Sequence, residues 1–281
     1  MSRQEFALYS FFSEADMNFS KVQYSHLKYG CDHAARNFGH QLAREYFAVH
    51  SAKLLSNQCV VIPSPYNHVH NAASTVTHHL VNMLNHLIAS SNGHNVETTV
   101  IHRKVNYTMD YGFLQKEQRE QLINNDEFYF NEEFIKDKFL IFVDDVKITG
   151  AHERRMCRLL DDSKLTNDCM FLYIASYTGI DPTIEAHLNL NAVDTDDDFI
   201  KLISAPTRNV VVRSIKWLLS KDIERLRSLL ARIIRTDWSY LEEIYFGCLG
   251  EGYHTIPVYQ PQFAVLKQTY ESAFHDQANW N

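Results

Sequence analysis

Cysteine is scarce in this chain and follows no pattern typical of a zinc site or a disulfide framework. The sequence has five cysteines, with no CxxC pair and no Cys/His zinc spacing. An odd number of scattered cysteines is typical of proteins whose thiols stay reduced. We therefore expect a cytoplasmic protein.

Long apolar runs, a secretion signal and repeats are also missing. No apolar run approaches the ~20 residues of a membrane span, and residues 1–20 contain no charged segment followed by an apolar core. The chain has neither an internal repeat nor a low-complexity tract. These absences predict a soluble protein that does not contact a membrane.

Positive charge does not dominate either. The formal net charge is −7, which argues against a nucleic-acid partner. A local basic pocket for a small phosphate is compatible with this total, because a net charge does not describe individual sites. Hydrophobic residues make up 45 % of the sequence. This is enough for a sizeable core in one large α/β domain with an appendage, or in two modest domains.

The sequence does contain a regular alternation of apolar strand patterns with helical patterns. The strand patterns cover 59–62, 96–105, 138–143 and 169–176, and the helical patterns cover 32–55, 71–90 and 153–160. The run at 138–143 has no polar alternation, as in a central parallel strand covered on both faces. This order predicts an α/β fold with a doubly wound parallel sheet.

Two further segments have their own character. Residues 106–137 are polar, charged and aromatic without a clean period, which is typical of a lid or binding loop. Beyond residue 206 the chain is helical, with one apolar stripe over 223–234 that we expect to begin at Ser220 and a second helix that ends at Gly250. We therefore divide the chain into an α/β domain, 1–205, and a mainly helical appendage, 206–281.

The most informative segment follows the strand at 138–143. Asp144 and Asp145 close this strand, and Thr149 and Gly150 precede the next helix. In an open α/β sheet, ligands bind beyond the carboxyl ends of the strands. Two carboxylates there can accept hydrogen bonds from the vicinal hydroxyls of a ribose, while backbone N–H groups at a helix N-terminus bind a phosphate. The segment 143–152 therefore predicts a site for a 5-phosphorylated ribose.

This segment resembles the phosphoribosyl pyrophosphate signature of type I phosphoribosyltransferases. Lys147, Ile148 and His152 depart from the signature, and His152 would then donate from its ring in place of a lost hydroxyl. The run from Asp144 to Glu153 is similar to that of the phosphoribosyltransferases encoded in bacterial tellurium-resistance gene clusters. The resemblance covers about 20–205. The matching positions are Asp144, Asp145, Val146, Thr149, Gly150 and Ala151.

The resemblance implies a fold of the phosphoribosyltransferase type, with a long hood loop over 106–137 and a C-terminal helical appendage. It also implies a role for each part of the site. Asp144 and Asp145 would bind the ribose, and Arg103 and Lys104, at the start of the hood, would act in catalysis. The 5-phosphate would contact Lys147, Ile148, Thr149, Gly150, Ala151 and His152. The pyrophosphate loop would contain Ser64, Pro65 and Tyr66.

The remaining implications concern ligands and partners. Mg²⁺ would be bound mainly through the ligand's own oxygens, without a metal site made of protein residues. Lys28 would join the site, and residues 176–179 would contribute to the pocket for an unknown base. The C-terminal helices would cover that pocket or form a homodimer contact. Glu153 is expected to point outward, because a second carboxylate would repel the phosphate.

Two functions of different class remain open. The first is a Mg²⁺-dependent phosphoribosyltransferase that uses phosphoribosyl pyrophosphate and a nitrogenous base. The second is a non-catalytic sensor of phosphoribosyl pyrophosphate or a ribose 5-phosphate ligand. The hydroxyls lost at Ile148 and His152 favour the sensor, whereas Arg103 and the long lid favour the enzyme.

Other interpretations of these patterns are weaker. A receiver domain also has an acidic pair at a strand end, but there the pair closes the first strand. A plain polar strand end is the remaining alternative for Asp144 and Asp145. His79 and His86 share a helical face, yet no carboxylate in this region completes a metal site. We expect them to be surface or core histidines.

Overall fold

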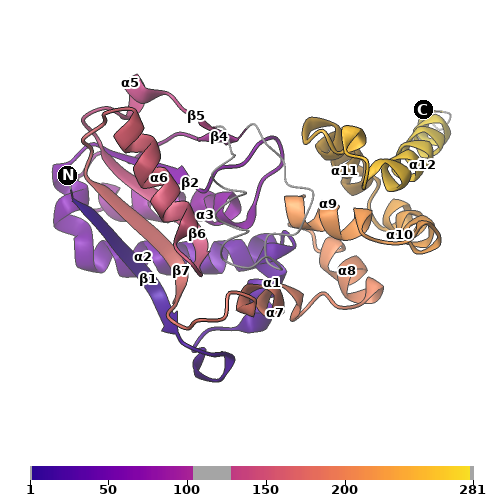
Figure 1. The fold of residues 1–281 in the computed structure, drawn as a ribbon, viewed down its shortest axis with the longest axis horizontal. Coiled ribbons are helices and arrows are strands. Elements are labelled where there is room, and N and C mark those ends of the chain that lie inside the picture. Colours follow the sequence, from indigo (N-terminus) through magenta and orange to yellow (C-terminus); the bar gives the residue numbers. More distant parts are fainter. Residues whose placement is uncertain (1, 104–127, 279–281) are drawn as a thin grey trace.

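The computed structural model describes residues 2–103 and 128–278, which form an α/β part and a group of C-terminal helices (Figure 1). Among these residues the main sheet has five strands in the order β1-β7-β6-β2-β3. Every pairing in this sheet is parallel, which confirms the predicted doubly wound parallel sheet. The strands are β1 (Arg3–Phe11), β2 (Cys59–Pro63), β3 (Glu97–Thr98), β6 (Phe139–Lys147) and β7 (Cys169–Tyr177).

Helices cover both faces of this sheet (Figure 1). The helices α2 (Asp32–Ser56) and α3 (Ala72–Ala89) lie on one face, and α6 (Ala151–Asp162) lies on the other. Along β6, Ile141 and Val143 pack with α2 and α3, whereas Leu140 and Phe142 pack with α6. Burial on both faces explains why the sequence of β6 shows no polar alternation.

The strand β6 is longer than its apolar run predicts. It continues through Asp144 and Asp145 to Lys147, while β2 ends at Pro63, opposite Val143. The acidic pair therefore extends past the end of β2. Because β2 leads through α3 to one edge of the sheet and β6 leads through α6 toward the other, the chain reverses direction between these two strands. Such a switch point is where open α/β sheets bind ligands.

The predicted strand over 96–105 was wrong in its extent. Only Glu97 and Thr98 pair with β2. The chain then leaves the sheet, and Ile101 is buried among the residues of the α6 face. A second, two-stranded antiparallel sheet follows, in which β4 (His102–Arg103) pairs with β5 (Phe128–Tyr129).

The expected hood segment lies only partly within the described residues. Positions 104–127, which include Lys104, lie outside them. Residues 128–137 contain β5 and a short helix, α5 (Glu132–Ile135), capped by the side chain of Asn131. This end of the segment is therefore structured rather than a plain loop.

The N-terminal region contains two elements that the sequence patterns did not reveal. The edge strand β1 pairs with β7 along almost its whole length. A short 3-10 turn (Glu14–Asp16) leads to α1 (Lys21–Lys28), whose N-cap residue Ser20 accepts a hydrogen bond from the backbone of Gln23. This helix places Lys28 at the carboxyl end of the sheet.

Six α-helices and one 3-10 turn follow β7 in the described part of the chain. They are α7 (Ile184–Leu190), α8 (Asp196–Ile203), α9 (Val212–Leu219), α10 (Ile223–Thr236), α11 (Trp238–Gly250), a 3-10 turn (Tyr253–Thr255) and α12 (Gln260–Ala278). The helix α10 does not begin at Ser220, which instead follows the last residue of α9. Its N-cap is Asp222, whose carboxylate accepts a hydrogen bond from the backbone N–H of Arg225.

The C-terminal helices share their apolar core with the α/β part. Phe199 stacks on Trp217 at a centroid distance of 4.5 Å, and Tyr29 and Val69 belong to the same buried cluster. Contacts from the α1–α2 junction and the β2–α3 loop thus fix α9 beyond the carboxyl ends of the strands (Figure 1). None of the helices in the described segments is both long and apolar enough to cross a membrane.

Candidate active site

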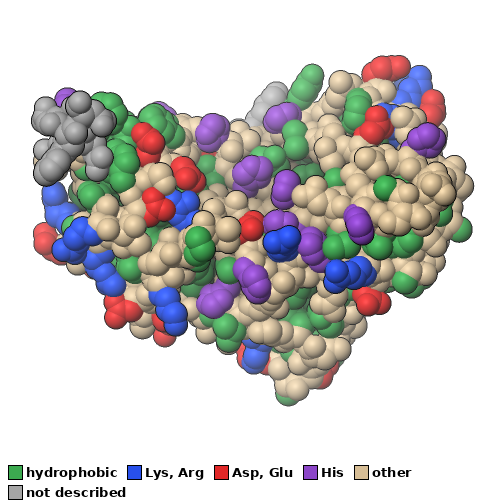
Figure 2. All heavy atoms as spheres, turned by 180° about the vertical axis from the view of Figure 1, so that it is seen from behind, with side chains coloured by type: hydrophobic (Ala, Val, Ile, Leu, Met, Phe, Trp, Pro, Cys, Tyr) green, Lys and Arg blue, Asp and Glu red, His purple; other side chains and the backbone are tan. Residues whose placement is uncertain are grey.

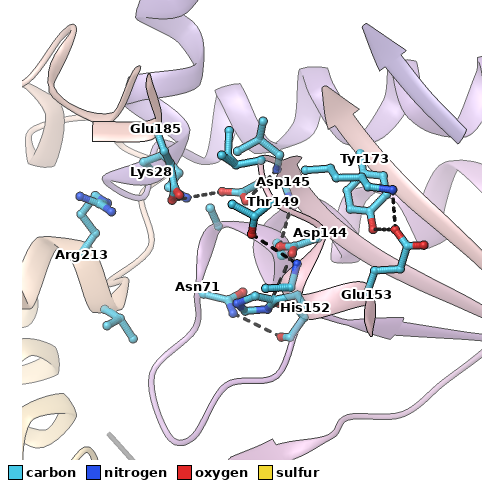
Figure 3. A pocket seen from close by; sticks show the side chains of 18 of the residues that line it. Lys28, Asn71, Asp144, Asp145, Thr149, His152, Glu153, Tyr173, Glu185 and Arg213 are labelled. Atoms are coloured by element: carbon cyan, nitrogen blue, oxygen red, sulfur yellow. Dashed lines mark hydrogen bonds and ion pairs between the residues drawn. The ribbon is translucent and has the colours of Figure 1, made fainter. Parts of the chain in front are cut away.

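A cavity of about 220 Å³ lies where β2 and β6 end (Figure 3). It brings together residues that are far apart in the sequence. The α/β part contributes Lys28, Ser64, Asn71, Ala72, Ala73, Arg103, residues 144–153, Tyr173 and Glu185. The segment leading into α9, and α9 itself, contribute Val211, Val212, Arg213 and Lys216.

The loop after β6 presents the N-terminus of α6 to this cavity. Gly150 precedes the helix with a φ of +68°, a conformation that residues with a Cβ rarely adopt. The Thr149 hydroxyl accepts a hydrogen bond from Ala151 N at 3.4 Å, and Arg154 donates to the Thr149 carbonyl at 2.8 Å. These local contacts hold the first N–H groups of a 12-residue helix toward the cavity, an arrangement that favours an anion.

Two side chains of this loop hold the loop itself. Lys147 forms ion pairs with Glu5 and Glu153, the second at 2.7 Å. Ile148 packs against the buried cluster that contains Phe11. Lys147 is therefore already neutralised by carboxylates. Ile148 offers apolar contact where the family signature has a hydroxyl.

We expected Glu153 to point away from the site, but this expectation was wrong. It lines the cavity and accepts a hydrogen bond from the Tyr173 hydroxyl at 3.1 Å. Figure 3 shows it at one side of the cavity, directed toward Tyr173. The ion pair with Lys147 offsets its charge, so the carboxylate can lie beside an anion site at a smaller electrostatic cost.

The two carboxylates of β6 have different environments. Asp145 is buried and accepts hydrogen bonds from Lys28 Nζ, from the Tyr24 hydroxyl at 3.3 Å and from Val146 N at 2.8 Å. Lys28 also lies 3.8 Å from Glu185. Burial opposes the ionisation of Asp145, but the charge and hydrogen bond of Lys28 outweigh it and lower its pKa. Asp145 is thus held as a paired carboxylate.

Asp144 faces the cavity, and 23 % of its side chain remains exposed. Burial of the group, together with the negative charge of Asp145, raises the pKa of Asp144 to about 8. A carboxyl group with a raised pKa in a cleft is typical of a functional position. The acidic pair therefore contains one structural partner for Lys28 and one group that a ligand can reach.

His152 connects the two loops of the site. Its Nδ1 lies 3.3 Å from the Ser64 hydroxyl and 3.9 Å from Asp144 Oδ2. Ser64 is in turn fixed to β6, because its N–H donates to the Val143 carbonyl at 2.7 Å. The imidazole therefore lies between the predicted phosphate loop and the predicted pyrophosphate loop.

The three residues expected in the pyrophosphate loop have different positions. Ser64 lines the main cavity, whereas Pro65 lines only a smaller neighbouring one. Tyr66 lines neither cavity, and its ring packs on His70 at 4.9 Å. Its carbonyl accepts a hydrogen bond from Arg103 N. Arg103 itself lines the main cavity.

Several lining residues were not found by sequence reasoning. Asn71 caps α3 and also donates to the carbonyls of Ser64 and Pro65. An asparagine before a helical pattern is a cap signal that could have identified it. Glu185, Arg213 and Lys216 lie in segments without a motif, and no local signal points to them. Residues 176–179, expected in the base pocket, do not line the cavity.

Histidines gather on the face of the molecule that Figure 2 shows. On α2 and α3, His79 Nε2 lies 2.8 Å from Asp32 Oδ1, and the rings of His79 and His40 are 6.1 Å apart. Within 2–103 and 128–278, no group of three or more His, Cys, Asp or Glu side chains could hold a metal ion.

A parallel sheet with an acidic strand end, a glycine turn and a helix N-terminus at its switch point is the architecture expected for a phosphoribosyltransferase-type protein. The model of the family described as PRTase ComF-like matches residues 2–266. The chain therefore belongs to this phosphoribosyltransferase (PRTase) family. The match extends past both ends of the segment 20–205 and includes α9 to α11.

Solved structures of a hypoxanthine phosphoribosyltransferase from Staphylococcus aureus are distantly similar. The tetragonal form shares 9 % identity with a TM-score of 0.34, over 50 % of this chain and 73 % of that one. The orthorhombic form shares 8 % identity with a TM-score of 0.30, over 50 % and 74 %. No curated protein matches the chain. The assignment therefore rests on the family match.

Proposed function

We propose that this protein is a phosphoribosyltransferase, which transfers a phosphoribosyl group between pyrophosphate and a nitrogenous base. One observation carries the proposal. In a single cavity, an acidic strand end that includes a reachable carboxyl group, Asp144, lies directly before the glycine-capped N-terminus of α6. Such an arrangement suits a ligand that has vicinal hydroxyls next to a phosphate.

The ligand would extend across the cavity in one direction. The 5-phosphate would bind the loop that contains Thr149, Gly150 and His152. The ribose hydroxyls would donate to Asp144, with Asp145 holding Lys28 beside them. The pyrophosphate would then lie toward Ser64 and Arg103, at the end of β2. Membership of the family and the cavity lining support this orientation.

The reaction is a displacement at C1 of the ribose. The ring nitrogen of the acceptor forms a bond to C1 and releases its proton to water, the bond from C1 to the pyrophosphate oxygen breaks, and its electron pair leaves with pyrophosphate. Positive charge develops on the ribose and negative charge on the leaving group. The residues contribute mainly by positioning the reactants and by stabilising these charges.

Mg²⁺ enters this proposal as part of the substrate. Asp145 is already paired with Lys28, and the described residues contain no ready-made metal site. These features suit an ion that is carried by the pyrophosphate oxygens and water. Bound in this way, Mg²⁺ would neutralise part of the leaving group's charge.

The finer assignments belong to the same proposal. We propose a cytoplasmic enzyme of the subfamily encoded in tellurium-resistance gene clusters, with a homodimer as its expected assembly. The acceptor is a nitrogenous base of unspecified type. A non-catalytic sensor of the same ligand is the second candidate, favoured by Ile148, which provides no hydroxyl to a phosphate.

Calorimetric titration tests the binding part of the proposal. We expect the wild-type protein to bind ribose 5-phosphate, and to bind phosphoribosyl pyrophosphate more tightly in the presence of Mg²⁺. Above pH 8, where Asp144 is ionised, the Asp144→Asn variant should lose about 10-fold or more in affinity for both ligands, because a hydrogen bond to a charged group is weakened. Asp162→Asn, the same change at an exposed position of α6, is the matched control.

A pyrophosphate-release assay over a panel of nitrogenous bases then separates the two candidates. The enzyme should release pyrophosphate with at least one base, whereas a sensor should bind the ligand and release none. If the wild-type protein binds neither ribose 5-phosphate nor phosphoribosyl pyrophosphate, both candidates are wrong.

A further inference from the structure

The C-terminal helices are built directly onto the loop between β2 and α3. The buried carboxylate of Glu251, at the end of α11, accepts hydrogen bonds from His68 N at 2.8 Å and from Val69 N at 2.7 Å. At the start of α9, the N–H of Val212 donates to the His70 carbonyl at 3.0 Å. These contacts fix α9 beside the part of the cavity where Ser64 and Asn71 lie.

The same helix is also fixed to the segment that carries Lys28. The Ser214 hydroxyl donates to the Tyr29 carbonyl at 3.0 Å, and Asn209 N donates to the Gly30 carbonyl at 2.8 Å. Gly30 has a φ of +93°, and a Cβ there would lie 2.0 Å from the Asn209 carbonyl oxygen. The β2–α3 loop and the segment after Lys28 both contribute to the cavity, and both are attached to α9 or to the residues just before it. The helix α9 is therefore part of the wall of the site.

This wall presents two cations to the cavity. Arg213 and Lys216 are three residues apart on α9, so they share a helical face, and both line the cavity. Figure 3 shows Arg213 on the side of the cavity opposite Glu153 and Tyr173.

We propose that Arg213 and Lys216 bind the pyrophosphate group, so that the C-terminal helices complete the leaving-group half of the active site. This inference rests on the proposed function. A ligand whose 5-phosphate lies at the N-terminus of α6 and whose ribose lies at Asp144 extends toward Ser64, Asn71 and α9. Pyrophosphate is the most highly charged part of that ligand, and a guanidinium binds phosphate oxygens in a two-point geometry.

The start of α3 adds to this half of the site. Ala72 and Ala73, the first residues of α3, line the cavity next to Asn71. Their helix N-terminus favours an anion at this end, on the same side as the two cations of α9. The cavity therefore offers two separate anion-binding ends, one at α6 and one between α3 and α9.

Comparison of two ligands tests this assignment. Calorimetry would measure the affinity of wild-type protein, Arg213→Gln and Lys216→Gln for ribose 5-phosphate and for magnesium phosphoribosyl pyrophosphate. Arg227→Gln, the same change at an exposed position of α10, is the control. We expect each cavity variant to lose about 10-fold or more in affinity for phosphoribosyl pyrophosphate, with ribose 5-phosphate affinity within about twofold of wild type.

The outcomes separate the inference from the function on which it rests. If the wild type binds both ligands and neither variant weakens phosphoribosyl pyrophosphate binding, the assignment of Arg213 and Lys216 is wrong. An equal loss for both ligands would also overturn it, since these residues would then serve the whole cavity and not the pyrophosphate. Failure of the wild type to bind ribose 5-phosphate would instead overturn the proposed function. The Arg213→Lys variant should recover part of the lost affinity.

Discussion

The two loops at the floor of the cavity are held in place by different kinds of contact. The loop after β6 is held largely by its own neighbours, through the Thr149 hydroxyl, Arg154 and the backbone turn at Gly150. The loop after β2 has a local contact through Asn71, but it is also held from a distance, by Glu251 of α11 and by Val212 at the start of α9. One anion site is therefore local in sequence, and the other requires the C-terminal helices.

Because of this difference, substitutions should have different effects at the two ends of the cavity. A change in the loop after β6 should alter the phosphate end and leave the rest of the site in place. A change in the C-terminal helices should loosen the β2–α3 loop, although those helices lie more than 140 residues further along the chain. Four sets of variants test this contrast.

The first prediction concerns the ion pair between Lys28 and Asp145 at the end of β6. Lys28→Met should lower the free energy of unfolding by about 3–5 kcal/mol, because Asp145 then remains as a buried charge without its partner. Urea denaturation would measure the loss. Lys21 lies on the same helix as Lys28 and forms a more exposed ion pair with Glu14. Lys21→Met should therefore lower the free energy of unfolding by at most about 1 kcal/mol. Similar losses in the two variants would mean that the buried pair of Lys28 with Asp145 contributes no more to stability than the exposed pair.

The second prediction concerns the other loop. Glu251→Gln weakens two hydrogen bonds to the backbone of the β2–α3 loop and should cost about 1.5–3 kcal/mol. Hydrogen exchange should accelerate at the amides of His68 and Val69 and stay unchanged in the loop after β6. Glu271→Gln, at an exposed position of α12, is the control. Equal acceleration in both loops would contradict the contrast between them.

The third prediction follows from the raised pKa of Asp144. Between the ordinary value of 3.8 and about 8, the folded protein retains a proton that the unfolded chain has lost. The free energy of unfolding therefore falls as the pH rises through this window. Between pH 5 and pH 8.5 the free energy of unfolding should fall by at least about 1.4 kcal/mol more in the wild type than in Asp144→Asn. This difference corresponds to a shift of about one pKa unit. Parallel stability curves for the two proteins would rule out a raised pKa at this position.

The fourth prediction concerns the turn at Gly150. Gly150→Ala imposes a Cβ on a φ of +68° and should destabilise the protein by about 1 kcal/mol. It should weaken ribose 5-phosphate binding, while hydrogen exchange at the amides of the β2–α3 loop should stay close to that of the wild type. Thermal unfolding would measure the stability, calorimetry the ligand affinity, and hydrogen exchange the amides of the loop. A stabilised variant with unchanged ligand affinity would show that the turn has no part in the site.

The features that could be predicted from the sequence are those that depend on local patterns. The apolar run of β6, the acidic pair and the glycine turn are adjacent in the chain, so their order alone indicated a phosphate site at a strand end. The two long helices of the α2/α3 face followed from their periodicity. The extent of β6 was underestimated, because Asp144 and Asp145 are polar residues in a strand whose neighbour β2 has already ended.

The features that could not be predicted depend on contacts between distant segments. Lys28 gave only a weak signal, and Arg213, Lys216 and Glu251 gave none, because each acts through residues far along the chain. The edge strand β1 was missed since its half-exposed residues resemble a loop. The strand expected over 96–105 ends at Thr98, and the later part of the segment pairs instead with β5, which lies further along the chain.

A crystal structure of the protein with magnesium phosphoribosyl pyrophosphate would locate each group of the ligand within the cavity. We predict the 5-phosphate at the N-terminus of α6, the ribose hydroxyls at Asp144, and the pyrophosphate between the β2–α3 loop and Arg213. A ligand bound outside this cavity, or bound in it with its 5-phosphate away from residues 149–152, would contradict the account.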